Sequence, residues 1–573
     1  MATDATRPAP GAGGQFVGLF TPKLVTVLSE GYGLRQLRAD ALAGLTVAIV
    51  ALPLSMAIAI ASGATPAMGL YTAIIGGFLV SALGGSRYQI GGPAGAFIVL
   101  VAATVAREGI DGLILATFMA GIILVAAGFL RIGTYIKFIP YPVTVGFTAG
   151  IAAIIFASQI SGLLGLTLDG PEPGPLIEKI SALWAALPSF NGWSVALAAG
   201  TAALILGLRH VNSRLPGMLI AVTAAGVATA LFALPVDTIG TRFGGIPSGL
   251  PLPALPDLSL AKVEAVLPDA IAFALLGAIE SLLSAVVADG MSGRRHRSNC
   301  ELVAQGAANM GSALFGGFCV TGTIARTATN VRAGAHGPVS GMLHSAFLLA
   351  FMLIAAPLAA YIPLAALAAV LAVVSWQMVE RHAIGILMRA SRGDALVLSV
   401  TFLLTVFRDL TEAIVVGFAL GSVIFIHRMS GSTVVEAGTP MVPEDRADDS
   451  YARHGLPEVP GVVLYKVRGV LFFGAASAIE GVLDRIGSQH KALVLDLSRV
   501  PFLDSTGANT IGGLVAKART RGVRIAISGA LDPVRRDLAT HGIAAPQVIL
   551  VPTIPAAIEA LEAEGVIAAP APG

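Results

Sequence analysis

A long series of apolar runs constrains the fold of this chain more than any other feature. Runs of about twenty apolar residues, the length that crosses a bilayer as a helix, recur from residue 39 to residue 428. Over 573 residues, 55% are hydrophobic and only 12% are charged. This composition predicts a polytopic α-helical membrane protein and excludes an ordinary soluble enzyme. The predicted continuous spans are 39–61, 66–84, 112–130, 140–162, 192–208, 214–234, 267–289, 299–317, 339–357, 361–379, 394–408 and 410–428.

Two further spans are interrupted by small and hydroxyl residues. Tyr88–Leu100 reads YQIGGPAGAFIVL, and Phe318–Asn330 reads FCVTGTIARTATN. Each predicts a half-helix whose first backbone N–H groups are unpaired and carry the positive end of the helix dipole. Irregular backbone at that depth is tolerated only inside protein or along a cavity. We therefore expect an anion site where the two half-helices meet; Gly-rich packing contacts between helices are the alternative.

The interrupted spans, 92–106 and 323–333, bring the total to fourteen and are third and tenth in order. They hold equivalent places in two seven-span halves of opposite orientation, the pattern of inverted repeats. With a cytoplasmic N-terminus, the inside loops hold fifteen Lys and Arg residues and the outside loops hold five. This asymmetry predicts that both termini are cytoplasmic. The connections 163–190 and 235–266 are expected to be outside loops.

The two ends of the chain differ from the apolar region. Residues 1–38 form a polar N-terminal segment without an apolar signal core, so we expect no cleaved signal peptide. After the transport region (39–430), we assign 431–460 to a linker, 461–565 to a small α/β domain and 566–573 to a tail. In that domain, strand and helix patterns alternate. The predicted strands are 461–469, 471–474, 492–498 and 523–529, and the predicted helices are 475–487 and 504–522.

Five sequence blocks, in order, resemble the SulP family of anion transporters, the sulfate permeases. They are ALPLSMAIAIASGATPAMGLYTAIIGGF, IGGPAGAF, LLGAIESLLSAVVADGMSGRRHRSNCELVAQGAANMGSALFGGF, TGTIARTATNVRAG and, in the C-terminal domain, LVLDLSRVPFLDSTG, which resembles a STAS domain. The resemblance implies seven-plus-seven inverted repeats divided into a core domain and a gate domain. It also implies an anion held between spans three and ten, transport by alternating access, and often a dimer. Members carry sulfate, bicarbonate, chloride, oxalate or dicarboxylates.

The predicted anion-binding residues lie where the two half-helices begin. Backbone N–H groups and hydroxyls are the expected donors, with an apolar cavity wall from Phe97, Leu54 and Ile58, although core packing is the favoured interpretation for any one of these three residues. Arg326 either supports the anion electrostatically or anchors span ten through backbone carbonyls. The anion-binding set is Gly92, Pro93, Ala94, Gly95 and Phe97 in span three, with Thr321, Gly322, Thr323, Ile324, Ala325 and Arg326 in span ten.

Glu280 stands in the otherwise uncharged run IAFALLGAIESLLSAVV. A carboxylate there is costly unless it is paired, solvated or protonated. Ser284 is four residues on and shares its helical face. Glu280 therefore takes up a proton during transport, pairs with Arg326, or does both. In sodium-coupled relatives, the resemblance places Asp at the position of Glu280 and Thr at that of Ile324, so the departures here favour proton over sodium coupling.

In the C-terminal domain, Asp504, Ser505 and Thr506 precede a predicted helix and are typical N-cap residues. The resemblance also places Ser505 where bacterial STAS relatives are phosphorylated, which makes phosphorylation a second possibility.

The chain has no metal-ligand cluster, Walker loop or nucleophile triad in its sequence, so we expect no enzyme activity, no metal and no cofactor. We predict a secondary active transporter of the inner membrane that moves a sulfate-type anion with protons, and the resemblance implies a homodimer. The expected partners are the anion, the proton and the bilayer, and not nucleic acid. Bicarbonate or C4-dicarboxylate transport, a channel, and a membrane-tethered STAS signalling protein are the alternatives.

Overall fold

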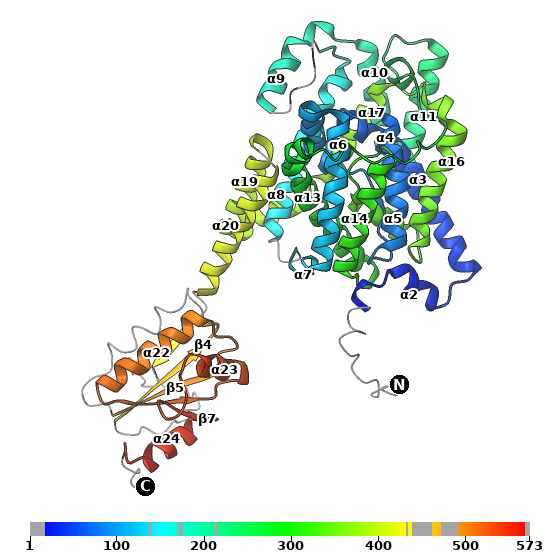
Figure 1. Cartoon of the computed structure of the whole chain (residues 1–573). Coiled ribbons are helices and arrows are strands. Elements are labelled where there is room, and N and C mark those ends of the chain that lie inside the picture. The colour runs from blue at the N-terminus through cyan, green and yellow to red at the C-terminus, as the bar shows by residue number, and fades with distance from the viewer. Residues whose placement is uncertain are drawn as a thin grey trace. The chain divides into compact units, whose positions relative to one another are not determined.

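The computed structural model describes residues 18–136, 140–168, 170, 173, 176–211, 216–408, 410–430, 434–437, 461–471 and 491–567. The chain divides into two compact units, Met1–Ala419 and Leu420–Gly573. The first is built from helices, and the second contains a five-stranded sheet (Figure 1). The predicted fold class, a polytopic helical membrane unit with a small α/β domain after it, is confirmed.

Each predicted span corresponds to a helix or half-helix in the same order. Among the described residues, nine helical stretches are long and apolar enough to cross a bilayer, one of which runs from Leu364 to Arg389 and so includes both α17 and the short helix that follows it; α11, α14, α15 and α19 are shorter. The spans are α3 (Leu34–Ala61), α4 and α5 (Pro66–Tyr71 and Gly77–Leu83), two halves of α6 (Ile98–Phe129), α8 (Tyr141–Leu164), α10 (Gly192–Val211), α11 (Gly217–Phe232), α13 (Leu260–Ser292), α14 (Ser298–Leu314), α15 (Ile324–Arg332), α16 (Val339–Ala359), α17 (Leu364–Met378), α19 (Arg392–Phe407) and α20 (Leu410–Ser430).

Spans three and four are joined without a loop. The backbone of α6 leaves the helical conformation at Gly109, whose φ of +70° is readily adopted only by glycine. Farther along α6, Gly121 faces Gly306 of α14. A Cβ added at Gly121 would lie 2.7 Å from the carbonyl oxygen of Gly306, so these two helices approach through their backbones.

The helices form two packed groups. In one, α6 contacts α13 and α14, α16 contacts α3 and α5, and α15 contacts α3 and α13. In the other, α8 contacts α17 and α19, and α10 contacts α11 and α17. The first group contains spans one to four and eight to eleven, which make up the core domain, and the second makes up the gate domain. Contacts of α3 with α11 and α17 join the two groups.

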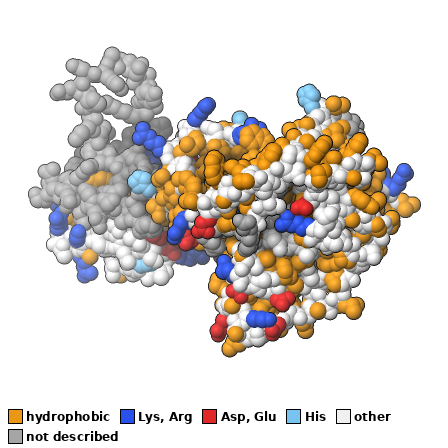
Figure 2. Space-filling view, turned by 90° about the horizontal axis from the view of Figure 1, so that it is seen from above, with side chains coloured by type: hydrophobic (Ala, Val, Ile, Leu, Met, Phe, Trp, Pro, Cys, Tyr) orange, Lys and Arg blue, Asp and Glu red, His pale blue; other side chains and the backbone are white. Residues whose placement is uncertain are grey.

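Apolar side chains cover much of the outer surface of the helical unit, as Figure 2 shows for one face. Large hydrophobic side chains are exposed on both groups of helices, among them Ile354 (81%) of α16 and Leu231 (75%) of α11. Exposure of such a surface to water is unfavourable, whereas its contact with the acyl chains of lipids carries no such cost. The exposed apolar surface therefore supports the assignment of these helices to the membrane.

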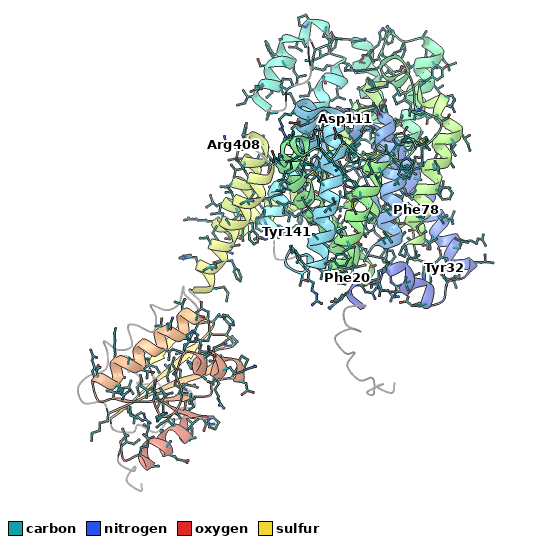
Figure 3. All side chains as sticks on the ribbon, in the orientation of Figure 1. Phe20, Tyr32, Phe78, Asp111, Tyr141 and Arg408 are labelled. Carbon is teal, nitrogen blue, oxygen red and sulfur yellow. The ribbon has the colours of Figure 1, made fainter. Side chains whose placement is uncertain are left out.

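The segment before α3 is attached to one end of the helical unit, where Figure 3 labels Phe20 and Tyr32. Arg297 donates hydrogen bonds to the carbonyl oxygen of Thr21 (2.6 Å) and to Thr26 Oγ1 (3.0 Å) in and before α2 (Lys23–Ser29). Arg87 pairs with Glu30, and this hydrogen bond holds the pKa of the Glu30 carboxyl below its usual value.

Two connections that were predicted to be ordinary loops contain helices, which corrects the sequence analysis. The first contains α9 (Leu176–Ala185), and the second contains α12 (Ile239–Phe243) and the first turns of α13. The cause is local: α9 is amphipathic and buries only one side, so it has no uniform apolar run. In α12, Thr238 caps the helix start by accepting a hydrogen bond from the Thr241 N–H at 3.2 Å.

The second unit is a sheet with the strand order β3-β4-β5-β6-β7, in which β3 is antiparallel and the rest are parallel. Leu493, Leu495 and Leu497 of β5 point to a core shared with α22 and α23, while Ala492 and Val494 point to a core shared with α24. This alternation places helices on both faces. The elements are β3 (Val434–Ala437), β4 (Val462–Arg468), β5 (Ala492–Arg499), α22 (Ser505–Thr520), β6 (Arg524–Ser528), α23 (Asp532–Thr540), β7 (Ile549–Val551) and α24 (Ile554–Ala563).

The predicted strands 461–469, 492–498 and 523–529 and the helix 504–522 are present. In the predicted strand 471–474, Leu471 forms a single bridge with Leu503, and the rest lies outside the described residues, as does the predicted helix 475–487. The assignment of 431–460 to a linker is wrong at β3, which pairs with β4 as an edge strand. β3, with only four residues, was too short to be recognised as a strand.

Candidate anion site

The two interrupted spans meet through a two-stranded sheet. β1 (Gly91–Gly92) pairs antiparallel with β2 (Thr321–Gly322), with Gly91 opposite Gly322 and Gly92 opposite Thr321. The pairing continues through the Thr323 N–H, which donates to the Ile90 carbonyl oxygen at 3.0 Å. Segments more than 200 residues apart in the sequence are thus joined inside the core domain, where protein rather than lipid satisfies the irregular backbone.

A half-helix follows each strand. After β2, α15 begins at Ile324, and its N-cap residue Thr323 provides no side-chain cap. The N–H groups of Ile324, Ala325 and Arg326 have no hydrogen-bond partner within the described part of the chain. After β1, a 3-10 turn (Gly95–Phe97) leads into α6. The N–H groups of Gly95 and Ala96, the first two residues of this turn, likewise have no hydrogen-bond partner among the described residues. Both half-helix starts can therefore donate to an anion.

The strand residues themselves use their polar groups within the protein. The Gly322 N–H donates to Ser281 Oγ at 3.1 Å. Thr321 Oγ1 donates to the Gly277 carbonyl oxygen (3.1 Å) and lies 2.8 Å from Ser281 Oγ. Thr323 Oγ1 donates to the Ile90 carbonyl oxygen at 3.3 Å. Thr321, Gly322 and Thr323 thus hold β2 in place, while the free donors begin at Ile324.

Arg326 is almost fully buried, with 2% of its surface exposed. Its Nη2 donates to Ser55 Oγ and to the Pro93 carbonyl oxygen, both at 3.2 Å, so the predicted anchoring to backbone is present. The guanidinium lies against Gly92, where an added Cβ would overlap Nη1. Nε and Nη1 are buried without a hydrogen-bond partner among the described residues. An anchored cation with two unused donors therefore lies between the half-helices.

Glu280 is also buried, with 7% of its surface exposed. Its carboxylate forms no hydrogen bond or ion pair with the described residues, and the Arg326 guanidinium bonds elsewhere. The structure therefore does not contain the Glu280–Arg326 pair that was one of the two sequence interpretations. Ser284, one turn on, donates to Thr327 Oγ1 at 3.1 Å and so links α13 to α15.

The predicted apolar wall belongs to the packed core. Phe97, Leu54 and Ile58 are buried in one hydrophobic cluster, and Phe97 contacts the Phe273 ring edge-on with centroids 6.0 Å apart. Pro93 and Ala94 lie between β1 and the 3-10 turn. Gly95 faces the gate domain: an added Cβ would lie 3.0 Å from Ile155 of α8 and 3.9 Å from Met378 of α17.

A buried polar network behind β2 was missed by the sequence analysis. Gln89 Nε2 donates to the Ser281 carbonyl oxygen (3.1 Å) and to Glu301 Oε1 (3.0 Å). Glu301, fully buried, also accepts hydrogen bonds from Gln305 Nε2 and the Ser86 N–H, both at 3.0 Å. The signal was available, because Gln89, Glu301 and Gln305 are polar side chains within or beside apolar spans.

In the second unit, Asp504 Oδ1 accepts a hydrogen bond from the Gly507 N–H at 2.7 Å, so Asp504 is the N-cap of α22. Ser505 is exposed at the first position of this helix. Its phosphorylation stays a prediction.

Comparisons with known proteins agree with this arrangement. The model of the Sulfate permease family matches residues 37–401, and that of the STAS domain matches residues 455–555. YvdB of Bacillus subtilis, which is named for sulfate transport, is 39% identical over 503 residues, covering 87% of this chain and 93% of its own.

The bicarbonate transporter BicA of a Picosynechococcus strain is 32% identical over 523 residues, covering 88% of this chain and 90% of its own. The murine Slc26a9 anion transporter, solved in the inward-facing state, matches the fold with a TM-score of 0.82, at 20% identity and 98% coverage of this chain and 97% of its own. From its two family matches and its relatives, this chain belongs to the sulfate permease (SulP) family of anion transporters and carries a C-terminal STAS domain.

Proposed function

We propose that this protein is a secondary active transporter that moves a small oxyanion, with sulfate as the leading substrate, by alternating access. One observation carries the proposal: among the described residues, the N–H groups at the start of both half-helices, at Gly95 and at Ile324 to Arg326, have no partner, and the buried Arg326 guanidinium bonds the backbone of span three at Pro93. Donors of this kind bind negative charge without requiring a covalent or metal ligand.

The division into core and gate domains supports alternating access. The half-helix starts and Arg326 belong to the core domain, and Gly95 faces α8 and α17 of the gate domain. A movement of one domain against the other would open the site to one side of the membrane and then to the other. We propose that the helical unit lies in the inner membrane. Because the basic residues are concentrated in the loops on the side of the N-terminus, we also propose that both termini and the STAS domain are cytoplasmic. A homodimer is a further proposal from the family.

We also propose that transport is coupled to protons through Glu280. This carboxylate is buried near the site without a basic partner among the described residues, so a proton is the simplest way to neutralise it. Ile324 offers no oxygen at the start of α15, whereas a sodium site needs several oxygen ligands. Proton coupling is therefore favoured over sodium coupling.

Bicarbonate is the second candidate substrate, because BicA, a bicarbonate transporter, is 32% identical to this chain. Backbone donors bind any small oxyanion, so the geometry alone favours neither. The full-length protein in proteoliposomes would be tested for uptake of labelled sulfate against competing bicarbonate, chloride, oxalate and a C4 dicarboxylate. We expect uptake of labelled sulfate above that of empty vesicles, and we expect unlabelled sulfate to compete more strongly than any of the other anions.

Three other outcomes would change the proposal. Strong competition by bicarbonate and weak competition by unlabelled sulfate would reassign the substrate. Absence of uptake for every anion, under any gradient, would favour a sensor in which the STAS domain transmits the signal. Large unitary currents would indicate a channel.

A further inference from the structure

The helix α18 (Arg381–Ala390) connects two membrane spans and cannot be a span itself. With ten residues it is about 15 Å long, half the apolar thickness of a bilayer. It follows α17 after two residues, and the single extended residue Ser391 separates it from α19. Because both neighbours cross the membrane, α18 lies at the level where spans leave the bilayer.

One side of α18 is packed against protein. Ala383, Ile384 and Leu387 form a small hydrophobic cluster with Val145 of α8 and Leu398 of α19. The rest of the helix is exposed and mixes two kinds of side chain. Ile386 and Met388 are about half exposed, beside the exposed Arg381, His382 and Arg389. Exposed apolar and basic residues on one short helix are typical of a helix in the interface between headgroups and acyl chains.

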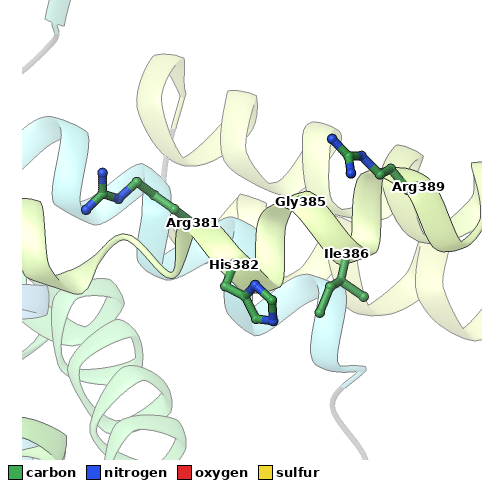
Figure 4. A pocket seen from close by; sticks show the side chains of 5 residues that line it. All are labelled: Arg381, His382, Gly385, Ile386 and Arg389. Carbon is green, nitrogen blue, oxygen red and sulfur yellow. The ribbon is translucent and has the colours of Figure 1, made fainter.

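The exposed side contains a shallow hollow of about 480 Å³ (Figure 4). His382, Gly385, Ile386 and Arg389 line it and follow the spacing of a single helical stripe. Gly385 leaves space in the middle of the stripe. In Figure 4, His382 and Ile386 project to the same side, and the Arg389 side chain extends back along the helix toward Gly385.

Arg381, which also lines the hollow, lies over the ring of Trp376, 4.7 Å from its centroid. The Trp376 side chain is 59% exposed, just before α18. Exposed Trp residues beside basic residues are enriched at the headgroup level of membrane proteins. Glu380, the acidic residue next to α18, already accepts a hydrogen bond from Tyr141 Oη at 3.2 Å. Arg389 forms no ion pair or hydrogen bond within the described residues, so its charge is available.

We propose that α18 binds an anionic phospholipid, with the phosphate at Arg389, within the electrostatic field of Arg381, and an acyl chain along Ile386, which lines the same hollow. Positive charge matches the phosphate, and the exposed apolar side chains match the chain beneath it. The ligand is thus a lipid of the surrounding leaflet and not the transported anion.

The test measures binding of phosphatidylglycerol and phosphatidylcholine to the full-length protein in detergent micelles, by native mass spectrometry. The charge variant is Arg381→Gln with Arg389→Gln. Two Arg residues near an anionic surface change affinity by roughly thirtyfold. We expect that loss for phosphatidylglycerol and almost none for phosphatidylcholine. The matched control is Arg294→Gln with Arg295→Gln, an exposed pair in another short loop, which should bind as the native protein does.

A second variant tests the apolar contact. Ile386→Ser keeps both charges, and binding of phosphatidylglycerol should weaken while the thermal midpoint of unfolding is unchanged. Binding by the charge variant within twofold of the native protein, or an equal loss in the control pair, would overturn the proposal. Full competition by millimolar inorganic phosphate would also overturn it, because a free anion would then account for the site.

Discussion

Arg326 of α15 donates a hydrogen bond from Nη2 to the carbonyl oxygen of Pro93, at a distance of 3.2 Å. The residue from span ten thereby binds the backbone of span three, and its second bond, to Ser55 Oγ, reaches span one. The site that the two interrupted spans predicted is therefore fixed by one side chain as well as by backbone pairing.

This contact predicts that Arg326→Lys is not a conservative change. Lysine keeps the charge but has one ammonium group in place of the planar fork that bonds two partners and leaves two donors free. We expect anion uptake to fall several-fold in Arg326→Lys and by about a hundredfold in Arg326→Gln, given about 1.4 kcal/mol for each factor of ten. Initial rates in proteoliposomes, corrected for protein content, measure this. Native uptake by Arg326→Gln would contradict a role in anion binding.

The free N–H groups at the start of α15 make a separate prediction at Ala325, whose side chain is exposed. A carboxylate in the first turn favours the helix, so Ala325→Asp should fold. The same carboxylate would repel an anion from the donors, and uptake should fall at least about tenfold. Ala325→Asn is the isosteric, uncharged control and should keep most of the uptake. Equal uptake by both variants would place the anion elsewhere. Gly322 is unsuitable for this test, because any Cβ there overlaps the Gln89 amide.

Glu301 makes a prediction about stability. Its carboxylate oxygens accept from Gln89, Gln305 and the Ser86 N–H, and all three are donors. In Glu301→Gln, one oxygen becomes an NH₂ group that faces a donor, and the free energy of unfolding should fall by about 1–3 kcal/mol. The thermal midpoint of the purified protein should fall clearly. Glu108→Gln, at an exposed position, is the control and should leave the midpoint unchanged. A native midpoint in Glu301→Gln would show that the network adds little.

Removal of the STAS domain is expected to change the rate of uptake but not the selectivity among anions. The proposed donors, Arg326 and Glu280 all lie in the helical unit, and the sheet domain has its own two hydrophobic cores. Truncation after Ser430 should therefore lower expression or uptake rate and leave the ratio of sulfate to bicarbonate uptake unchanged. That ratio is the measurement. A reversed preference would place a specificity element in the C-terminal region.

The spans could be predicted because lipid requires about twenty apolar residues for each crossing, and this pattern is visible in the sequence. The meeting of spans three and ten could be predicted because an interrupted span needs protein around its unpaired backbone. The sequence does not show which donors are already used. The Gly322 N–H was an expected donor, but Ser281 of α13 binds it, and this pairing depends on how three helices pack.

Short elements and elements with one buried side were harder to predict for a related reason. α9 buries only one side, and β3 has four residues, so neither forms a long periodic pattern. Gln89 and Glu301 are polar residues in apolar surroundings, which marks them as important, but the two partners of Gln89, Ser281 and Glu301, are 192 and 212 residues away in sequence. The identity of such partners follows only from the tertiary structure.

Coupling provides the last prediction, and it rests on Glu280. Glu280→Gln imitates the protonated side chain and removes the exchangeable proton, while the half-helix donors and Arg326 remain intact. An inward proton gradient should then no longer drive uptake, whereas exchange of labelled for unlabelled anion should persist. Glu178→Gln, a change in α9 outside the proposed site, is the control and should keep the proton dependence.

The measurement compares labelled-anion uptake into vesicles under separate proton and sodium gradients, for the native protein and for Glu280→Gln. Sodium should have little effect on the native protein, because Ile324 provides no ligand oxygen. Strong stimulation by sodium at constant pH would refute proton coupling. A proton dependence that persists in Glu280→Gln would assign the coupling to another group. Glu280 is buried and has no ion-pair partner among the described residues, so its negative charge carries a free-energy cost that protonation or solvent must offset. Loss of proton coupling in Glu280→Gln would identify protonation as the way in which this cost is offset.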